Sequence, residues 1–294
     1  LVRIELRLQL RLELRRRVRR RLRRRVRRLR GLLVRPGVGL GWRPETAWAC
    51  ERRADLALTE VIAESVPTRG PIPAPLRALL DRGVPIIPHG VSLSLGSGDP
   101  PCPRRLARLR EVATRLDAPF VSEHLAFVRG GGVETEHLLP VRRTADALDV
   151  VVDNVLRAQD ALGLPIAIEN IAQLYEAQLH EAQGAMDEAS FLRALTLRTG
   201  CKLLLDVSNL HANALNFGWD VEAWLDRYPL ERVAYVHVAG GAWCGDFYRD
   251  THAHPVSEGP LELLASLARR GLRLPTLLER DDGFGSREAL YREL

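Results

Sequence analysis

Side chains that bind metal ions recur along this sequence at the ends of short apolar runs. Each of these runs ends in, or is soon followed by, a histidine, carboxylate or amide residue, namely His89, His124, Glu169, Asp206, Asn209, His237 and Glu279. No cysteine stands at these positions. Mixed nitrogen and oxygen donors suit iron, manganese, zinc or cobalt rather than a thiolate zinc site or an iron–sulfur cluster.

More ligand-type residues stand between and after the last two apolar runs. Asp250, His252 and His254 lie in a stretch that we expect to be a loop, and Asp281 follows Glu279 by two residues. A single histidine after a strand is as easily explained by packing or capping, but the recurrence at consecutive run ends is not. So many donors exceed the coordination of one ion, which predicts two or three ions that share a bridging carboxylate.

The apolar runs themselves have the length and spacing of strands in an α/β fold. Helix-like sequence separates them, apart from the first pair, as βα units require. The expected strands are Val38–Leu40, Leu56–Ile62, Val84–Pro88, Phe120–Ser122, Pro165–Ile168, Lys202–Leu205, Val233–Val236 and Thr276–Leu278. Eight near-continuous apolar strands favour a closed (β/α)₈ TIM barrel, in which all the carboxyl ends of the strands open onto one face.

Several helices are expected between these strands. The clearest are Pro103–Leu116, Thr144–Leu162, Met186–Thr199 and Pro260–Arg270, with a short final helix from Ser286 to Leu294. The glycine run at 130–132 predicts a tight turn, because no helix start with Lys-Ser/Thr follows it as a phosphate-binding loop requires. We therefore expect residues 34–294 to form a single barrel domain.

Residues 1–33 differ sharply from the rest. Residues 1–35 contain 16 of the 43 basic residues and only 2 of the 37 acidic ones, so the remainder is mildly acidic despite the net charge of +6. We interpret residues 1–33 as a low-complexity, Arg-rich extension that is disordered or weakly helical. An acidic body lacks the clustered basic face that a DNA duplex needs, which makes nucleic-acid binding an unfavoured function.

The four cysteines are scattered and form no CxxC pair. No segment has the pattern of a signal peptide, and no apolar run is long enough to span a membrane. These features favour a reduced, cytoplasmic setting without a membrane partner.

The strand-end motifs also carry a family resemblance. HGVSLSLG (89–96), SEHLAF (122–127), IENI (168–171), GCKLLLDVSN (200–209), VHVAGG (236–241), DTHAHPV (250–256) and LLERD (277–281) resemble the multinuclear non-haem iron-dependent oxidative enzymes. That family includes the iron enzyme of methanobactin biosynthesis. The resemblance covers about Gly37 to Asp282 and implies a barrel similar to that of xylose isomerase.

The resemblance further implies an oxidoreductase that holds two or three iron ions of mixed Fe²⁺/Fe³⁺ state, without an organic cofactor. Such an enzyme uses O₂ to modify a ribosomally made precursor peptide, most often at cysteines, and many members work with a separate protein that recognises the leader peptide. The implied metal ligands are His89, His124, Glu169, Asp206, Asn209, His237, Asp250, His252 and Glu279. Glu169 is the expected bridge between two metals, and His254 and Asp281 are candidates for proton relays or supporting contacts.

Three departures from the family pattern stand out. Many members have a histidine soon after the first strand, where this chain has Arg43 and Glu45. Gly241 replaces the second histidine of the motif HLAGH, and Ser208 replaces an asparagine of the motif DVNN.

Two other functions remain open on the residues alone. One is a zinc- or manganese-dependent hydrolase or isomerase of the xylose-isomerase or abasic-site endonuclease type. The other is a metal-binding scaffold without catalysis.

Overall fold

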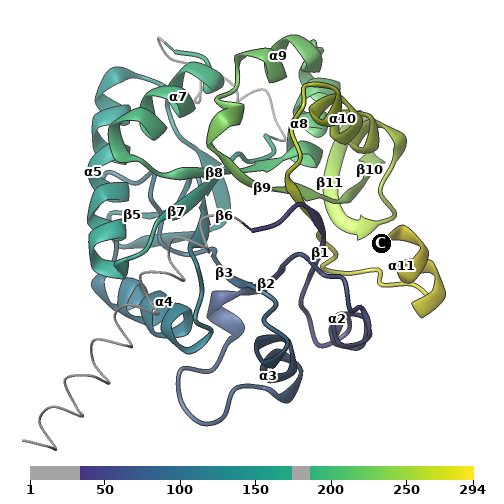
Figure 1. The fold of residues 1–294 in the computed structure, drawn as a ribbon. Helices are drawn as coiled ribbons and strands as arrows, with labels where there is room; N and C mark the ends of the chain where they lie inside the picture. Colours follow the sequence, from purple (N-terminus) through teal and green to yellow (C-terminus); the bar gives the residue numbers. More distant parts are fainter. Residues whose placement is uncertain (1–33, 174–185) are drawn as a thin grey trace, which may run out of the picture.

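The computed structural model describes residues 34–173 and 186–294, and in them eight parallel strands close into a barrel. The helices lie on the outside of this ring of strands (Figure 1). The barrel strands are β1 (Gly37–Gly41), β2 (Thr59–Ile62), β3 (Ile86–Gly90), β4 (Val121–His124), β7 (Ile166–Glu169), β8 (Lys202–Asp206), β9 (Val233–Val238) and β12 (Pro275–Leu278). β1 pairs with β12 and with β2, which closes the ring. The (β/α)₈ barrel expected from the sequence is confirmed.

Most of the predicted strands differ from the observed ones at their ends. The largest error lies at β2, where the prediction included residues 56–58, which are not in a strand. At β3 the prediction began two residues too early and stopped before His89 and Gly90. Apolar composition reveals which residues are buried, but the hydrogen-bonded ladder also continues through polar residues at the strand ends.

The outer helices include every helix expected within the described residues. These are α4 (Pro103–Arg115), α5 (Ala145–Leu162), α7 (Glu188–Thr199), α10 (Glu258–Arg269) and α11 (Arg287–Glu293). The sequence did not single out α2 (Ala47–Arg52), α3 (Ala74–Asp81), α8 (Val207–Phe217) and α9 (Val221–Arg227). α2, α3 and α9 have 6, 8 and 7 residues, too few turns to show a clear apolar period, whereas α8 follows β8 directly with no loop between them. The predicted extension of residues 1–33 lies outside the described residues.

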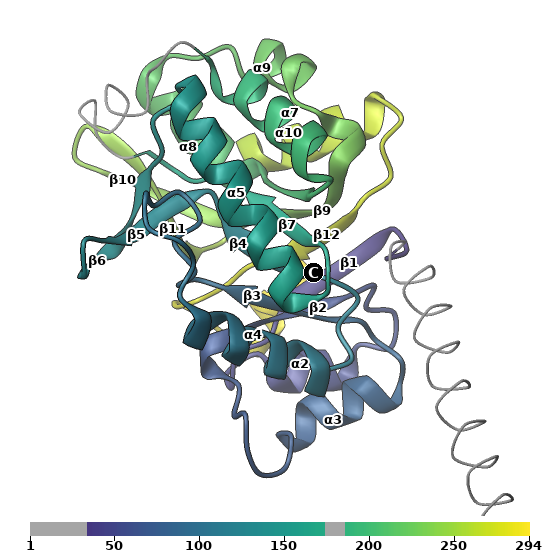
Figure 2. The same cartoon turned by 90° about the vertical axis from the view of Figure 1, so that its left-hand side faces the viewer.

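Two antiparallel hairpins that the sequence analysis did not predict project from the same end of the barrel (Figure 2). One is β5 (Ala126–Gly130) with β6 (Val133–Pro140), and the other is β10 (Gly240–Cys244) with β11 (Phe247–His254). Gly131 and Gly132 between β5 and β6 both have positive φ, which confirms the predicted tight turn. The stretch with Asp250, His252 and His254 was wrongly expected to be a loop, because it belongs to strand β11.

The apolar core has two parts. The larger part packs the outward faces of the strands against the helices. The smaller part fills the inside of the barrel and contains Leu58, Ile87, Ala167, Leu204 and Leu277. Among the residues that the structure describes, no helix combines the length and the apolar content needed to cross a bilayer.

Candidate metal centre

A regular step along the barrel strands places the polar residues of the site. Side chains two apart on a strand point to the same face, so each residue two positions after an inner apolar residue also points into the barrel. The pairs are Leu58 and Glu60, Ile87 and His89, Ala167 and Glu169, Leu204 and Asp206, Tyr235 and His237, and Leu277 and Glu279. A polar layer therefore lies above an apolar floor, at the carboxyl ends of the strands.

The first group of potential metal ligands consists of His89, His124 and Glu169. His89 Nε2 and His124 Nε2 lie 3.6 and 3.5 Å from the same carboxylate atom, Glu169 Oε2. The two imidazole rings meet edge to face with their centroids 4.6 Å apart. Both rings thus turn a nitrogen toward one point beside Glu169.

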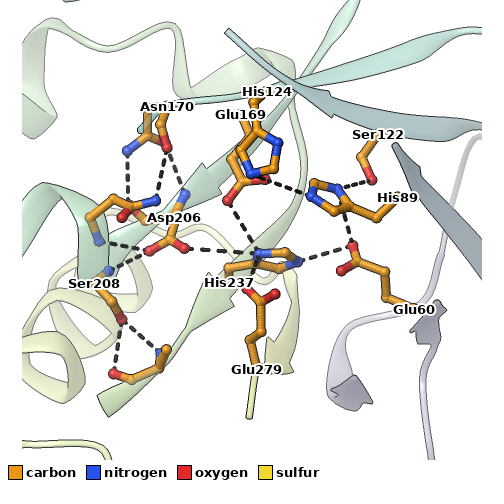
Figure 3. A network of polar contacts seen from close by, with 12 residues as sticks. Glu60, His89, Ser122, His124, Glu169, Asn170, Asp206, Ser208, His237 and Glu279 are labelled. Carbon is orange, nitrogen blue, oxygen red and sulfur yellow. Dashed lines mark hydrogen bonds and ion pairs between the residues drawn. The ribbon is translucent and has the colours of Figure 1, made fainter. Parts of the chain in front are cut away.

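Glu169 also belongs to a second group, with Asp206, His237 and Glu279. His237 Nδ1 lies 2.9 Å from Glu279 Oε2, 3.4 Å from Glu169 Oε1 and 3.9 Å from Asp206 Oδ2 (Figure 3). The two oxygens of Glu169 therefore face different groups. Glu169 is thus shared by two groups of potential ligands, and its role as a bridge between two metal ions stays a prediction.

The third group contains Asp206, Asp250 and His252, so Asp206 is shared as well. His252 Nε2 lies 2.7 Å from Asp250 Oδ2. In the hairpin, Gly240 pairs with His254 and Gly241 with Asp250, so residues 251–253 form a bulge. His252 has a φ of 52°, a left-handed conformation that is costly for a residue with a β-carbon. The hydrogen bond from Asp281 N to His252 O, at 2.8 Å, holds this bulge against the end of β12.

Unpartnered buried atoms show that these residues fit metal ions. Among the described residues, five such atoms belong to the three groups: His124 Nδ1, Glu169 Oε2, Asp206 Oδ2, His237 Nδ1 and Asp250 Oδ1. Buried polar atoms are nearly always hydrogen-bonded, since each unpaired one costs about 1–3 kcal/mol. Carboxylate and imidazole atoms that converge without partners are the donors that a cation requires.

The charges within the groups shift the pKa values strongly. Burial alone would lower the pKa of His124, but the carboxylates of Glu169 and Glu123 outweigh it and raise this pKa to about 9. Burial opposes ionisation of Glu169 too, yet His124 and His237 lower the pKa of its carboxyl to about 2. Asp206 behaves differently, because burial and the charges of Asp250 and Glu169 raise its pKa. Crowded carboxylates of this kind need a cation nearby.

A fourth group of His252, Glu279 and Asp281 has the spacing of a metal site, but an arginine already stands beside it. Arg43 Nη2 lies 2.5 Å from Asp281 Oδ1 and 3.6 Å from Glu279 Oε1. His252 Nδ1 lies 3.3 Å from Asp281 Oδ2. Both ring nitrogens of His252 face carboxylate oxygens, which only accept, so Nε2 donates to Asp250 and Nδ1 donates to Asp281. Asp281 is thus a supporting contact of His252, a role that the sequence analysis raised.

Asn209 and His254 are placed less centrally. Asn209 Nδ2 donates to the Asn170 carbonyl at 3.0 Å, and the Asn209 backbone N–H donates to Asp206 Oδ1 at 2.8 Å. Asn209 thereby orients Asp206, and its role as a ligand stays a prediction. The ring of His254 is exposed and pairs with Thr251 Oγ1 at 2.7 Å, outside the four groups of the described residues.

The sequence analysis assigned no role to Glu60, Ser122 or Tyr235, which lie fully buried below the histidines. Glu60 is the missed residue with the clearest signal. It follows the inner residue Leu58 by two positions, just as Glu169 follows Ala167. The predicted strand Leu56–Ile62 contains both residues, but Glu60 stands inside this run rather than at its end, where the sequence analysis looked for ligands.

A sequence model of the family described as "RiPP precursor modification enzyme MbnB/TglH/ChrH" matches residues 37–294. The chain belongs to this family. It is therefore an enzyme of the kind that modifies ribosomally synthesised precursor peptides, which confirms the resemblance seen in the strand-end motifs. Membership shows the family of this chain, but it does not by itself identify the substrate or the chemistry of this chain.

Curated relatives support this membership under the name UPF0276 protein. One from Streptomyces avermitilis is 49% identical over 265 residues, which cover 88% of this chain and 53% of that protein. The chain thus spans about half the length of that relative. One from Caulobacter vibrioides is 39% identical over 267 residues, covering 88% of this chain and 93% of the relative.

Solved structures show the same fold at low sequence identity. D-psicose 3-epimerase from Clostridium cellulolyticum has a TM-score of 0.57 at 12% identity, over 87% of this chain and 94% of that chain. A putative xylose isomerase from Rhodospirillum rubrum has a TM-score of 0.55 at 14% identity, over 88% and 96%. The xylose-isomerase-like barrel expected from the sequence is confirmed.

The structure explains two of the departures from the family pattern. A β-carbon at Gly241 would lie 2.5 Å from the carbonyl oxygen of Arg249 and 2.6 Å from the Tyr248 ring, so the hairpin has no room for a histidine there. Ser208 Oγ accepts from Ala239 N at 2.7 Å and donates to the Ala239 carbonyl at 3.0 Å. It therefore ties the start of α8 to the end of β9.

Proposed function

We propose that this protein is a multinuclear non-haem iron enzyme that uses O₂ to modify a precursor peptide, with cysteine residues as its targets. The observation that carries the proposal is the row of three ligand groups joined by Glu169 and Asp206, with unpartnered atoms converging in each. Nitrogen and oxygen donors without thiolate suit iron. The family's activity on precursor peptides supplies the substrate class.

The chain's own residues would hold and orient the ions. His89, His124 and Glu169 would bind one ion, Glu169, Asp206, His237 and Glu279 a second, and Asp206, Asp250 and His252 a third. Bound iron would supply O₂ activation and a site for a substrate thiolate. Asp281 would hold the proton of His252 Nδ1, which keeps Nε2 available as a ligand.

Exposure indicates the direction from which a peptide reaches the centre. The side chains of His237 and Glu169 are 0% and 2% exposed, whereas those of His252 and Asp281 are 22% and 42% exposed. A cysteine side chain would therefore approach past His252 and Asp281. This side lies at the end of the barrel from which the hairpins project (Figure 2).

The decisive experiment combines metal analysis with oxygen consumption. Protein purified without air should contain two or three irons per chain, with magnetically coupled iron visible by Mössbauer spectroscopy. Oxygen uptake should require a cysteine-containing precursor peptide, and a Cys→Ser peptide should abolish it. Stoichiometric zinc without iron, from iron-replete cells, together with hydrolytic or isomerase activity, would overturn the proposal.

Two smaller parts of the proposal concern the rest of the chain and its partners. Residues 34–294 would form the metal-binding domain alone, so deletion of residues 1–33 should leave the metal content unchanged. A separate protein would recognise the leader peptide. In that case, the full precursor should bind tightly to the enzyme only when the separate recognition protein is added. The isolated core peptide should bind to the enzyme equally weakly with or without that recognition protein.

A further inference from the structure

A buried polar network lies directly beneath the proposed metal positions. Glu60 of β2, Ser122 of β4 and Tyr235 of β9 meet inside the barrel, and each is 0% exposed. None of them belongs to the ligand groups found among the described residues. Burial of a carboxylate away from water is costly unless it is hydrogen-bonded, so its placement here calls for a physical reason.

Hydrogen bonds connect this network to histidines of two different groups. Glu60 Oε2 accepts from His237 Nε2 at 3.0 Å and from the Tyr235 hydroxyl. The Tyr235 oxygen lies 2.8 Å from Ser122 Oγ, which in turn lies 2.9 Å from His89 Nδ1. Figure 3 shows Glu60 beside both histidines, with Ser122 and Glu60 both next to Nδ1 of His89, at 2.9 and 4.0 Å.

The number of available protons fixes the direction of every bond in the network. A carboxylate only accepts, so the single hydroxyl proton of Tyr235 is donated to Glu60. The Tyr235 oxygen must then accept from the Ser122 hydroxyl, which leaves Ser122 Oγ to accept from the Nδ1–H of His89. The other carboxylate oxygen, Glu60 Oε1, has no hydrogen-bond partner among the described residues. No acceptor is therefore available there for a proton on Oε1.

These directions determine the tautomer of each histidine. His89 carries its proton on Nδ1 and leaves the lone pair of Nε2, which lies 3.6 Å from Glu169, free for a metal. With a metal bound, His237 would carry its one proton on Nε2 and present Nδ1 as the ligand; without metal, Nδ1 lies 2.9 Å from Glu279 Oε2 and forms an ion pair with it. In both cases the nitrogen offered to the metal is the one that faces the carboxylates of its group.

We propose that Glu60 is a positioning residue that sets the tautomers of both histidines, directly at His237 and through Tyr235 and Ser122 at His89. It thereby couples the two metal positions that share Glu169. This inference rests on the proposed metal centre. The supporting contacts of metal-binding histidines typically affect metal affinity about 10–100-fold.

Tyr235→Phe tests the longer branch, because it removes the hydrogen-bonded link to Ser122 and His89. It keeps the bond between Glu60 and His237 and the longer contact of 4.0 Å between Glu60 Oε2 and His89 Nδ1. Metal titration of the anaerobic apoprotein should show that one equivalent binds about 10–100-fold more weakly while the others are unchanged. The Mössbauer signal of one iron should change with it. Ser122→Ala should reproduce this result without altering Glu60, and it serves also if the Phe variant fails to fold.

Glu60→Gln tests the shared carboxylate. The amide oxygen can still accept from Tyr235 and His237, but the negative charge is lost. The reduction potentials of two irons should rise, more strongly for the one bound by His237, because a neutral acceptor makes imidazole a weaker donor. The third iron should keep its potential.

Tyr228→Phe is the matched control. The Tyr228 hydroxyl also donates to a buried glutamate, Glu188, but outside the barrel. This variant should lose stability and keep every metal equivalent at its normal affinity. The inference is overturned if Tyr235→Phe and Ser122→Ala bind all equivalents as wild type does, or weaken all of them equally. If the wild-type protein itself binds no metal, the proposed function fails instead.

Discussion

Two buried clusters of charged and polar residues in this protein differ in how their polar atoms are paired. Outside the barrel, Arg143 Nη1 donates to Glu188 Oε2 at 2.9 Å, and the Tyr228 hydroxyl donates to the other oxygen of Glu188. Inside the barrel mouth, Glu169, Asp206 and His237 are just as deeply buried but keep atoms without hydrogen-bond partners. The first cluster is neutralised by the chain itself, whereas the second requires ions from outside.

This difference separates a structural cluster from a functional one. A fully paired cluster stabilises one arrangement and offers no open coordination position. A cluster with converging lone pairs costs stability until a metal ion binds, so metal binding and folding are coupled. Burial and charge alone do not distinguish the two, but the partners of each atom do.

The strongest test of this comparison is Glu169→Gln, set against Glu188→Gln. Because Glu169 faces two groups, its variant should lose more than one metal equivalent and nearly all activity. Glu188→Gln should keep the full metal content. Elemental analysis and oxygen uptake measure both effects. A Glu169→Gln protein with its full complement of metal would show that this residue does not bridge.

Glu188→Ala should have the largest effect on stability. It leaves the buried guanidinium of Arg143 without the Glu188 carboxylate, a change that typically costs about 3–5 kcal/mol. Urea unfolding of the metal-free protein, followed by circular dichroism, measures this loss. A loss below about 1 kcal/mol, the range of exposed ion pairs, would contradict the structural role.

Asp250→Asn should have a more local effect than Glu169→Gln, because Asp250 belongs to a single group among the described residues. One metal equivalent should bind at least about 10–100-fold more weakly, since even supporting contacts of a ligand contribute that much. The other equivalents should be retained. Loss of all equivalents in the titration would mean that the three positions fill as one unit.

The pH dependence should have opposite signs for metal binding and for stability. The pKa of His124 is raised to about 9, so without metal this histidine is protonated at neutral pH. Metal must displace this proton, so affinity at the first group should rise about tenfold per pH unit up to pH 9. The apoprotein should instead lose stability from about pH 6.5 to 9, because the folded pKa lies above the unfolded one.

Measurement of both curves on one preparation separates these effects. Metal affinity comes from competition with a chelator, and apoprotein stability comes from denaturant unfolding at each pH. Glu188→Gln should leave the affinity curve unchanged, because its cluster lies outside the centre. A metal affinity independent of pH between 6 and 8 would contradict protonation of His124.

Much of the centre followed from local pattern. His89, Glu169, Asp206, His237 and Glu279 each stand at or just after a buried strand, and the barrel fold brings such positions together. The hairpins did not follow, because the alternation in short two-stranded elements is weak and Asp250 and His252 looked like loop residues. Glu60 received no role because it stands within its strand rather than at the end, where the ligands were sought.

The sequence by itself determined the barrel, the kinds of donor atom and the family, since these depend on residue type and on the order of the motifs. Only the tertiary structure decided which donor atoms lie together. It turned the two oxygens of Glu169 toward different groups, placed Arg43 beside Asp281, and set Glu60 under two histidines. These relations depend on distances of a few ångströms between strands far apart in the sequence, which no local pattern records.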